Sequence, residues 1–143
     1  MDAPVETVFA FHQRPDALEK LTPPPQRVEL IHREGGLQAG ARVELRLRFG
    51  PFSKRWIALH TEYAQNRRFV DIQIEGPFRS WRHRHEFTPE RGGTRLTDSV
   101  DFELPGGRFP ELLFGWLIRA QMEKMFAFRH AVTRRECEAR TGC

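Results

Sequence analysis

The sequence predicts an α+β domain with two short helices, an antiparallel meander of six strands and one long C-terminal helix. Apolar and polar residues alternate from about residue 28 to 104, which is the period of half-buried strands. Glycine, proline and asparagine interrupt this stretch, and the connections are so short that neighbouring strands must run antiparallel. After residue 110 the apolar residues recur at three- and four-residue spacings, which is the period of a helix.

The N-terminal residues are typical of a helix start. Asp2 offers a capping oxygen, a proline follows in the first turn, and Glu6 lies near the positive end of the helix dipole. This helix is expected to run to about His12. A second helix, residues 15–21, is expected to end before the three consecutive prolines that follow it, because proline cannot continue a helix.

The strands and the long helix follow from the two periods. Strands are expected at residues 28–34, 42–49, 54–63, 68–75, 79–88 and 94–104. The long helix is expected to span residues 111–139, with one face that is apolar except for an arginine. That face comprises Phe114, Ile118, Met122, Met125, Arg129 and Val132.

Composition limits the class of protein. A chain of 143 residues, of which 39% are hydrophobic, is expected to form a single domain over residues 1–143. No apolar run approaches the roughly 20 residues of a membrane-spanning helix, and the N-terminus has no signal-peptide pattern, so a cytoplasmic location is expected. The net charge of +4 is spread along the chain without blocks of like charge, which argues against nucleic acid as the partner.

The segment 76–98 is the most informative part of the chain, because it has the pattern of a β-hairpin with its turn at residues 89–93. Side chains alternate between the faces of a strand. One face of the first arm carries Trp81, His83, His85 and Phe87. A face with two aromatic rings should point into the protein, so two imidazoles are expected among apolar neighbours, where each needs a polar partner.

The second arm of the hairpin supplies such a partner. The predicted register pairs Phe87 with Leu96, His85 with Asp98, Trp81 with Phe102 and Arg82 with Asp101. The last of these pairs brings opposite charges together on the outer face, which favours this register. An ionisable cluster inside an otherwise apolar sheet is what a ligand pocket needs.

Several segments carry a resemblance to a known superfamily. They are APVETVFAF at 3–11, RWIALHTEY at 55–63, RFVDIQIEGPF at 68–78, SWRHRHEF at 80–87, GGTRLTDSVDFELPGG at 92–107 and MFAFRH at 125–130. Together with the order of elements they resemble the START-like, or SRPBCC, superfamily of helix-grip proteins, which includes polyketide cyclases, lipid carriers and the birch-pollen allergen group. The chain is most similar to the bacterial, cyclase-like members.

The resemblance implies a sheet that curves around the C-terminal helix, with a cavity between them for a hydrophobic or amphipathic small molecule. Members of the superfamily normally have a strand before the APVETVF helix, and this chain begins almost on that helix, so either the given start is late or truncated or the sheet has six strands. A six-stranded sheet would leave one edge unpaired, where a second copy could add. A homodimer is therefore a hypothesis, which a strict monomer mass at high concentration would contradict.

The strand at 68–75 allows two interpretations. The alternation favours an inward face of Val70, Ile72 and Ile74. The resemblance, in which an FVDxQ pattern stands next to GPF, favours Phe69, Asp71 and Gln73 instead, with a bulged turn after them. The second interpretation would add a carboxylate and an amide to the cavity beside His83.

The candidate ligand-binding residues come from the inward faces of the strands and from the long helix. They are Trp56, His60, Asp71, Gln73, Trp81, His83, His85, Asp98, Met122, Met125 and Arg129. The two tryptophans are expected to be cavity walls. His60 either lines the cavity or is exposed at a strand end, and Arg129 is expected to pair with a carboxylate or to extend to the cavity mouth.

Three roles are open for the cluster of His83, His85 and Asp98. It could be a hydrogen-bonded group that orients the hairpin, it could recognise the polar part of a ligand, or a histidine could act as general acid or base with Asp98 setting its tautomer. A His-x-His pair with an aspartate could also bind a metal, but the aspartate is not at a spacing typical of a third ligand, so this role is the least favoured. Cys137 and Cys143 match no zinc pattern, so no metal or other cofactor is expected.

The sequence therefore predicts a helix-grip domain that binds a small, mostly apolar molecule between the sheet and the C-terminal helix. The alternative is an enzyme of the polyketide cyclase or dehydratase type that uses His83 or His85 with Asp98. Proton transfer beside a carbonyl group is the chemistry that such a reaction requires.

Overall fold

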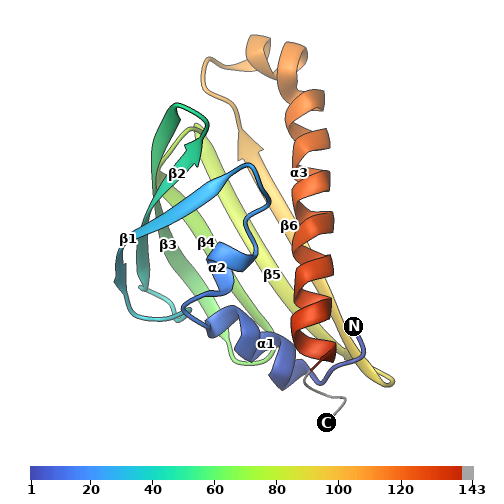
Figure 1. The fold of residues 1–143 in the computed structure, drawn as a ribbon. Helices are drawn as coiled ribbons and strands as arrows, with labels where there is room; N and C mark the ends of the chain where they lie inside the picture. Colours follow the sequence, from blue (N-terminus) through green and yellow to red (C-terminus); the bar gives the residue numbers. More distant parts are fainter. Residues whose placement is uncertain (140–143) are drawn as a thin grey trace.

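The computed structural model describes residues 1–139, and Cys143 lies outside them. Six strands form one antiparallel sheet in the order β1-β2-β3-β4-β5-β6, which confirms the predicted α+β helix-grip architecture (Figure 1). The elements are α1 Val5–Gln13, α2 Ala17–Lys20, β1 Arg27–Glu34, β2 Arg42–Phe49, β3 Phe52–Ala64, β4 Arg68–Glu75, β5 Ser80–Glu90, β6 Gly93–Glu103 and α3 Arg108–Glu138. None of the described helices has the length and apolar character needed to span a membrane.

Two helix boundaries differ from the prediction. Asp2 does not cap α1, because Pro4 holds the cap position and its carbonyl accepts hydrogen bonds from the Thr7 and Val8 amides. The Asp2 amide instead donates to Glu138 at the end of α3. The long helix begins before Pro110 and not after it, since a proline in the first turn lacks only an N–H that has no intrahelical partner there.

The register of the β5–β6 hairpin is confirmed. Trp81 lies opposite Phe102, Arg82 opposite Asp101, His85 opposite Asp98 and Phe87 opposite Leu96. The turn is tighter than predicted, because the ladder continues to the pair Glu90–Gly93 and leaves only Arg91 and Gly92 between the strands. Gly92 has a φ of 84°, which is a conformation that suits glycine.

The inward face of β4 consists of Phe69, Asp71 and Gln73, so the interpretation from simple alternation was wrong, although Val70 on the other face is also buried. Asp71 is the register partner of His60 in β3 and of His83 in β5. The β3–β4 pairing shifts register twice, once between Ile57 and Ala58 and once between His60 and Glu62. Such bulges bend a strand and increase its twist, and they accompany the curvature of the sheet in Figure 1.

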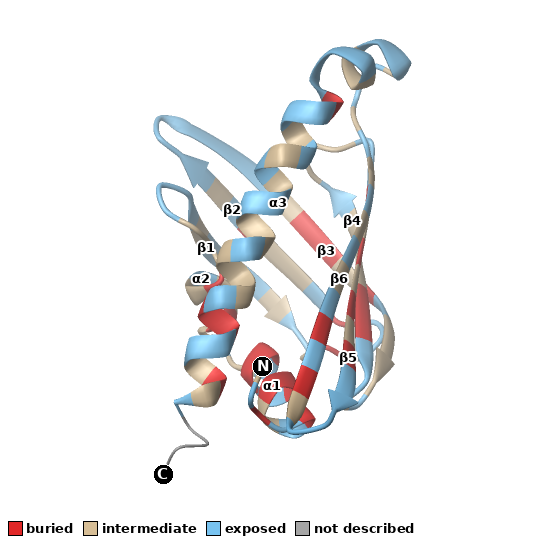
Figure 2. Cartoon of the chain, turned by 90° about the vertical axis from the view of Figure 1, so that its right-hand side faces the viewer, coloured by how far each residue is buried: buried red, intermediate tan, exposed pale blue. Residues whose placement is uncertain are grey.

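The hydrophobic core lies at the end of the sheet that α1 covers. Buried residues gather there, between α1, the lower parts of β5 and β6 and the C-terminal part of α3 (Figure 2). Phe9 is fully buried, and its ring makes edge-to-face contacts with Tyr63, Phe69 and Phe87. This core anchors α3 through Val132 and Cys137.

Candidate functional site

Three groups of side chains follow one another along the inner face of the sheet, from the end remote from α1 to the core beside α1. Each group is called a level below. The first is an aromatic level of Trp56, Phe78, Trp81 and Phe102. The second is a polar level of His60, Asp71, His83, His85 and Asp98. The third is the part of the apolar core that contains Phe69, Phe87 and Leu96. Every second residue of β5 contributes to this sequence of levels, because strand side chains alternate between faces.

Asp98 is the centre of the polar level. Its side chain is only 6% exposed and accepts a hydrogen bond from His83 Nε2 on Oδ1 at 2.9 Å and one from His130 Nε2 on Oδ2 at 2.6 Å. His85 Nδ1 lies 2.8 Å from Oδ1 as well, without the alignment of a hydrogen bond. Because a carboxylate only accepts, the two hydrogen bonds place N–H groups on Nε2 of His83 and His130.

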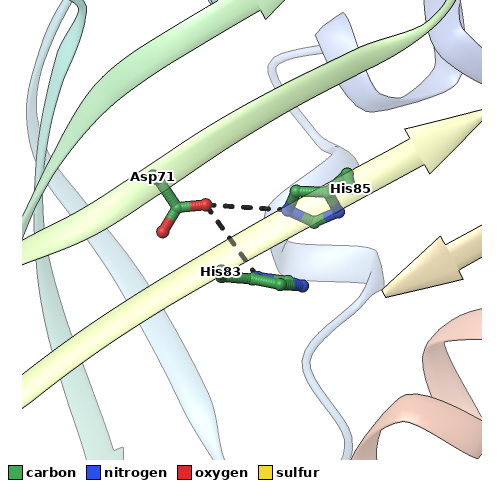
Figure 3. Close-up of side chains that lie close together, drawn as sticks. All are labelled: Asp71, His83 and His85. Atoms are coloured by element: carbon green, nitrogen blue, oxygen red, sulfur yellow. Dashed lines mark ion pairs between the residues drawn. The ribbon is translucent and has the colours of Figure 1, made fainter. Parts of the chain in front are cut away.

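Asp71 faces the same two imidazoles of β5 from the β4 side. Its Oδ2 lies 3.6 Å from His85 Nε2 and 3.9 Å from His83 Nδ1 (Figure 3). The ring centroids of the two histidines are 3.8 Å apart. Two buried carboxylates therefore enclose two neighbouring imidazoles, and they set the charge of this part of the protein.

The two histidines differ in their affinity for a proton. Burial and the neighbouring His85 lower the pKa of His83 to about 4. Burial also acts to lower the pKa of His85, but Asp71 and Asp98 outweigh it and raise that pKa above its ordinary value. The pKa of Asp98 lies far below its usual range, because the imidazoles of His130 and His83 outweigh its burial. His85 is thus the imidazole of the pair that binds a proton more readily.

Two histidines that the sequence interpretation did not select belong to this region. His130, on α3, reaches Asp98, and it lies four residues after Phe126, whose ring packs 5.1 Å from that of His83. His12, on α1, is buried with its ring 6.0 Å from that of His85. Its Nδ1–H donates to the Val8 carbonyl.

His12 gives the protein an acid-sensitive stability. Burial lowers its pKa from 6.5 to about 4, with a further contribution from His85, so the unfolded chain binds the proton first. The free energy of unfolding should therefore fall as the pH drops from 6.5 towards 4, by roughly 3 kcal/mol from this group. Urea unfolding across this pH range should show the loss, and His12→Phe should make the curve less steep while the contribution of His83 remains. An equally steep curve in the variant would contradict the assignment to His12.

The side-chain amide of Gln73 is not free to bind a ligand, because both of its polar atoms are hydrogen-bonded to the backbone of Phe78. Its Nε2 donates to the Phe78 carbonyl, and its Oε1 accepts from the Phe78 amide, so the side chain holds the β4–β5 connection. Gly76 leaves room for the Gln73 side chain, since a Cβ there would lie 2.3 Å from the Gln73 oxygen.

Trp56 and Trp81 pack edge to face with centroids 5.2 Å apart. His60 is buried and not exposed at a strand end, and its Nδ1 has no hydrogen-bond partner among residues 1–139.

Arg129 does not form the predicted ion pair with Asp71 or Asp98 in the described part of the chain. Its Nε donates to the Leu21 carbonyl, and its guanidinium lies 5.5 Å from the centre of the Phe126 ring. Burial lowers the pKa of Arg129, while the two aspartates oppose this shift. Met122 and Met125 are half-buried on the same helix.

The helix α3 leaves most of its length uncovered. Its buried residues are Gly115, Val132, Thr133 and Cys137, and three of these lie in its C-terminal third. The N-terminal half exposes large apolar side chains, which are Phe109, Leu112, Leu113, Phe114, Trp116 and Leu117. Two surface hollows of about 650 and 460 Å³ lie near α1, and neither is lined by a predicted ligand-binding residue.

Comparison with known proteins gives one matching family and several similar folds. The family model described as polyketide cyclase / dehydrase and lipid transport matches residues 1–128. No curated protein matches the chain. The crystal structure of TTHA0849 from Thermus thermophilus superposes with a TM-score of 0.77 at 21% identity, over 99% of this chain and 94% of that one.

Two further solved structures are similar in fold. The di-domain ARO/CYC StfQ from the steffimycin biosynthetic pathway gives a TM-score of 0.76 at 14% identity, over 99% of this chain and 49% of that chain. Ara h 8.0201 gives a TM-score of 0.63 at 14% identity, over 92% of this chain and 91% of that chain. These likenesses show that the curved sheet and long helix are a shared architecture.

Proposed function

Because the chain belongs to the polyketide cyclase / dehydrase and lipid-transport family, we propose that it binds a small, mostly apolar molecule between α3 and the inner face of the sheet. The observation that carries this proposal is the uncovered apolar surface of α3. Phe114 is 54% exposed although it lies on the same helix face as the half-buried Ile118 and Met122. A soluble protein rarely leaves such a surface without a partner.

The levels of the sheet suggest how the molecule would be oriented. Its apolar part would lie against the aromatic level, where Trp56 and Trp81 offer wide, rigid surfaces. Its polar group would reach the polar level. The Nδ1 atom of His60 has no partner among the described residues and is suited to bind such a group. A few directed polar groups in an apolar site are the usual source of orientation and specificity.

Mass spectrometry under native conditions tests the proposal. Protein purified mildly should carry a bound apolar molecule, and a fluorescent apolar probe such as anilinonaphthalene sulfonate should compete with it. Phe114→Ala should weaken probe binding several-fold because it removes an uncovered ring from the α3 face that carries Ile118 and Met122.

Phe109→Ala is the matched control, since the same ring is lost from a position about 140° around the helix. Equal weakening by both variants, or purified protein that neither carries nor takes up an apolar molecule, would contradict the proposal.

The second candidate function is an enzyme of the cyclase or dehydratase type. It is favoured by the hydrogen bonds through which Asp98 orients His83 and His130. StfQ, of similar fold, is described as an ARO/CYC protein of a biosynthetic pathway. Turnover of an aromatic polyketide or β-keto substrate that His85→Ala abolishes would support this function over simple binding.

A further inference from the structure

We infer that Asp71, His83 and His85 form a binding site for one divalent transition-metal ion of the Zn²⁺ class. Each offers a ligand atom, and the three atoms lie within 4.8 Å of one another. Two come from alternate residues of β5 and the third from the neighbouring strand β4, so the sheet backbone holds all three ligands (Figure 3). The site goes beyond the proposed binding of an apolar molecule and does not depend on it.

The hydrogen bond to Asp98 sets the required lone pair on His83, and the geometry of His85 allows the same arrangement. The N–H of His83 is on Nε2, which donates to Asp98, so Nδ1 carries a lone pair on the side of Asp71. His85 has the mirrored arrangement, with Nδ1 beside Asp98 and Nε2 beside Asp71. Metal-binding histidines characteristically turn their second nitrogen to a carboxylate, which fixes the tautomer and raises the basicity of the ligand.

The contacts of Asp71 fit an ion better than a direct hydrogen bond. Its distances of 3.6 and 3.9 Å to the two imidazoles are too long for hydrogen bonds, and its side chain is only 16% exposed. Among residues 1–139, neither a lysine nor an arginine forms an ion pair with it. Ligand atoms around a tetrahedral zinc lie roughly 3.3 Å apart, so small rotations of the two rings would bring the set to that size.

Two nitrogens and one carboxylate oxygen are a ligand set that suits Zn²⁺, Co²⁺ or Fe²⁺. Such a set leaves coordination positions for water or for a polar group of a bound molecule. His60 is the β3 register partner of Asp71, but its ring nitrogens do not belong to the ligand set. An ion here would place a positive charge beside the carboxylates of Asp71 and Asp98.

The test uses the whole protein after dialysis against a chelator. Titration with Co²⁺ should give the visible absorption of a low-coordinate ion with one Co²⁺ per chain, and Zn²⁺ should displace it in calorimetry. Asp71→Asn, His83→Gln and His85→Gln should each weaken binding by more than about 100-fold, and Asp98→Asn by about 10- to 100-fold. His32→Gln is the control, because His32 is an exposed histidine that pairs with Glu34 on β1. This variant should bind Co²⁺ and Zn²⁺ as tightly as the unchanged protein does.

A measurement on the unchanged protein guards against variants that fail to fold. In ¹⁵N spectra of the imidazoles, Zn²⁺ should shift Nδ1 of His83 and Nε2 of His85, and leave those of His32 in place. Failure of both ions to bind, or unchanged affinity in a folded His83→Gln/His85→Gln double variant, would overturn the site. Binding of the apolar probe is measured separately. A protein that binds no metal can therefore still bind the probe, and a protein that binds no probe can still bind the metal, so the two proposals fail independently.

Discussion

Asp98→Ala is expected to lower the free energy of unfolding by at least about 3 kcal/mol, because it removes the carboxylate that faces three imidazoles. The side chain is almost fully enclosed, so water cannot replace both of its hydrogen bonds without opening the interior. Denaturant unfolding of the metal-free protein at neutral pH measures the difference.

Asp98→Asn is the matched control, since it retains the shape and one acceptor oxygen but loses the charge. It should destabilise less than the alanine variant and keep the fold. It should also lower the pKa of His85, because a neighbouring carboxylate favours the imidazolium. An NMR titration of the metal-free variant in which His85 titrates as before would contradict the contact between Asp98 and His85.

Phe9→Ala is expected to cost about 3 to 5 kcal/mol of stability, because a fully buried ring leaves a cavity among Tyr63, Phe69 and Phe87. The large effect follows from the position of the core, which is concentrated beside α1. Chemical denaturation monitored by circular dichroism would measure it.

Phe109→Ala serves as the comparison, since that ring is 72% exposed at the start of α3. Its loss should change stability by no more than about 0.5 kcal/mol. A large loss in Phe109→Ala would mean that the N-terminal half of α3 is packed and not uncovered. That result would remove the main support for binding a molecule there.

The hairpin register was predictable because its determinants are local. One face of the hairpin is apolar, because Trp81 pairs with Phe102 and Phe87 with Leu96. The other face brings opposite charges together in the pair Arg82–Asp101. A shift by one residue would turn the aromatic side chains to the solvent. The tighter turn did not disturb this register, since the pairs Pro89–Thr94 and Glu90–Gly93 continue the same ladder.

The inward face of β4 was not decided by alternation alone. Alternation treats Asp71 as a solvent residue, whereas two histidines of β5 face it inside the protein. Bulges in β3 and β4 also break the simple period along this pair of strands. The sequence did not identify His12 and His130 as site residues, because their partners His85 and Asp98 lie on elements distant in the chain.

The amino-acid pattern by itself determined the order of helices and strands, the meander and the pairing of His85 with Asp98, since these depend on periodicity and on short connections. Only the tertiary structure decided that Asp71 and His130 join the same cluster and that α3 is anchored by its C-terminal third. The physical reason is distance along the chain: contacts between remote elements depend on how the curved sheet, α1 and α3 pack together. No local pattern encodes that packing.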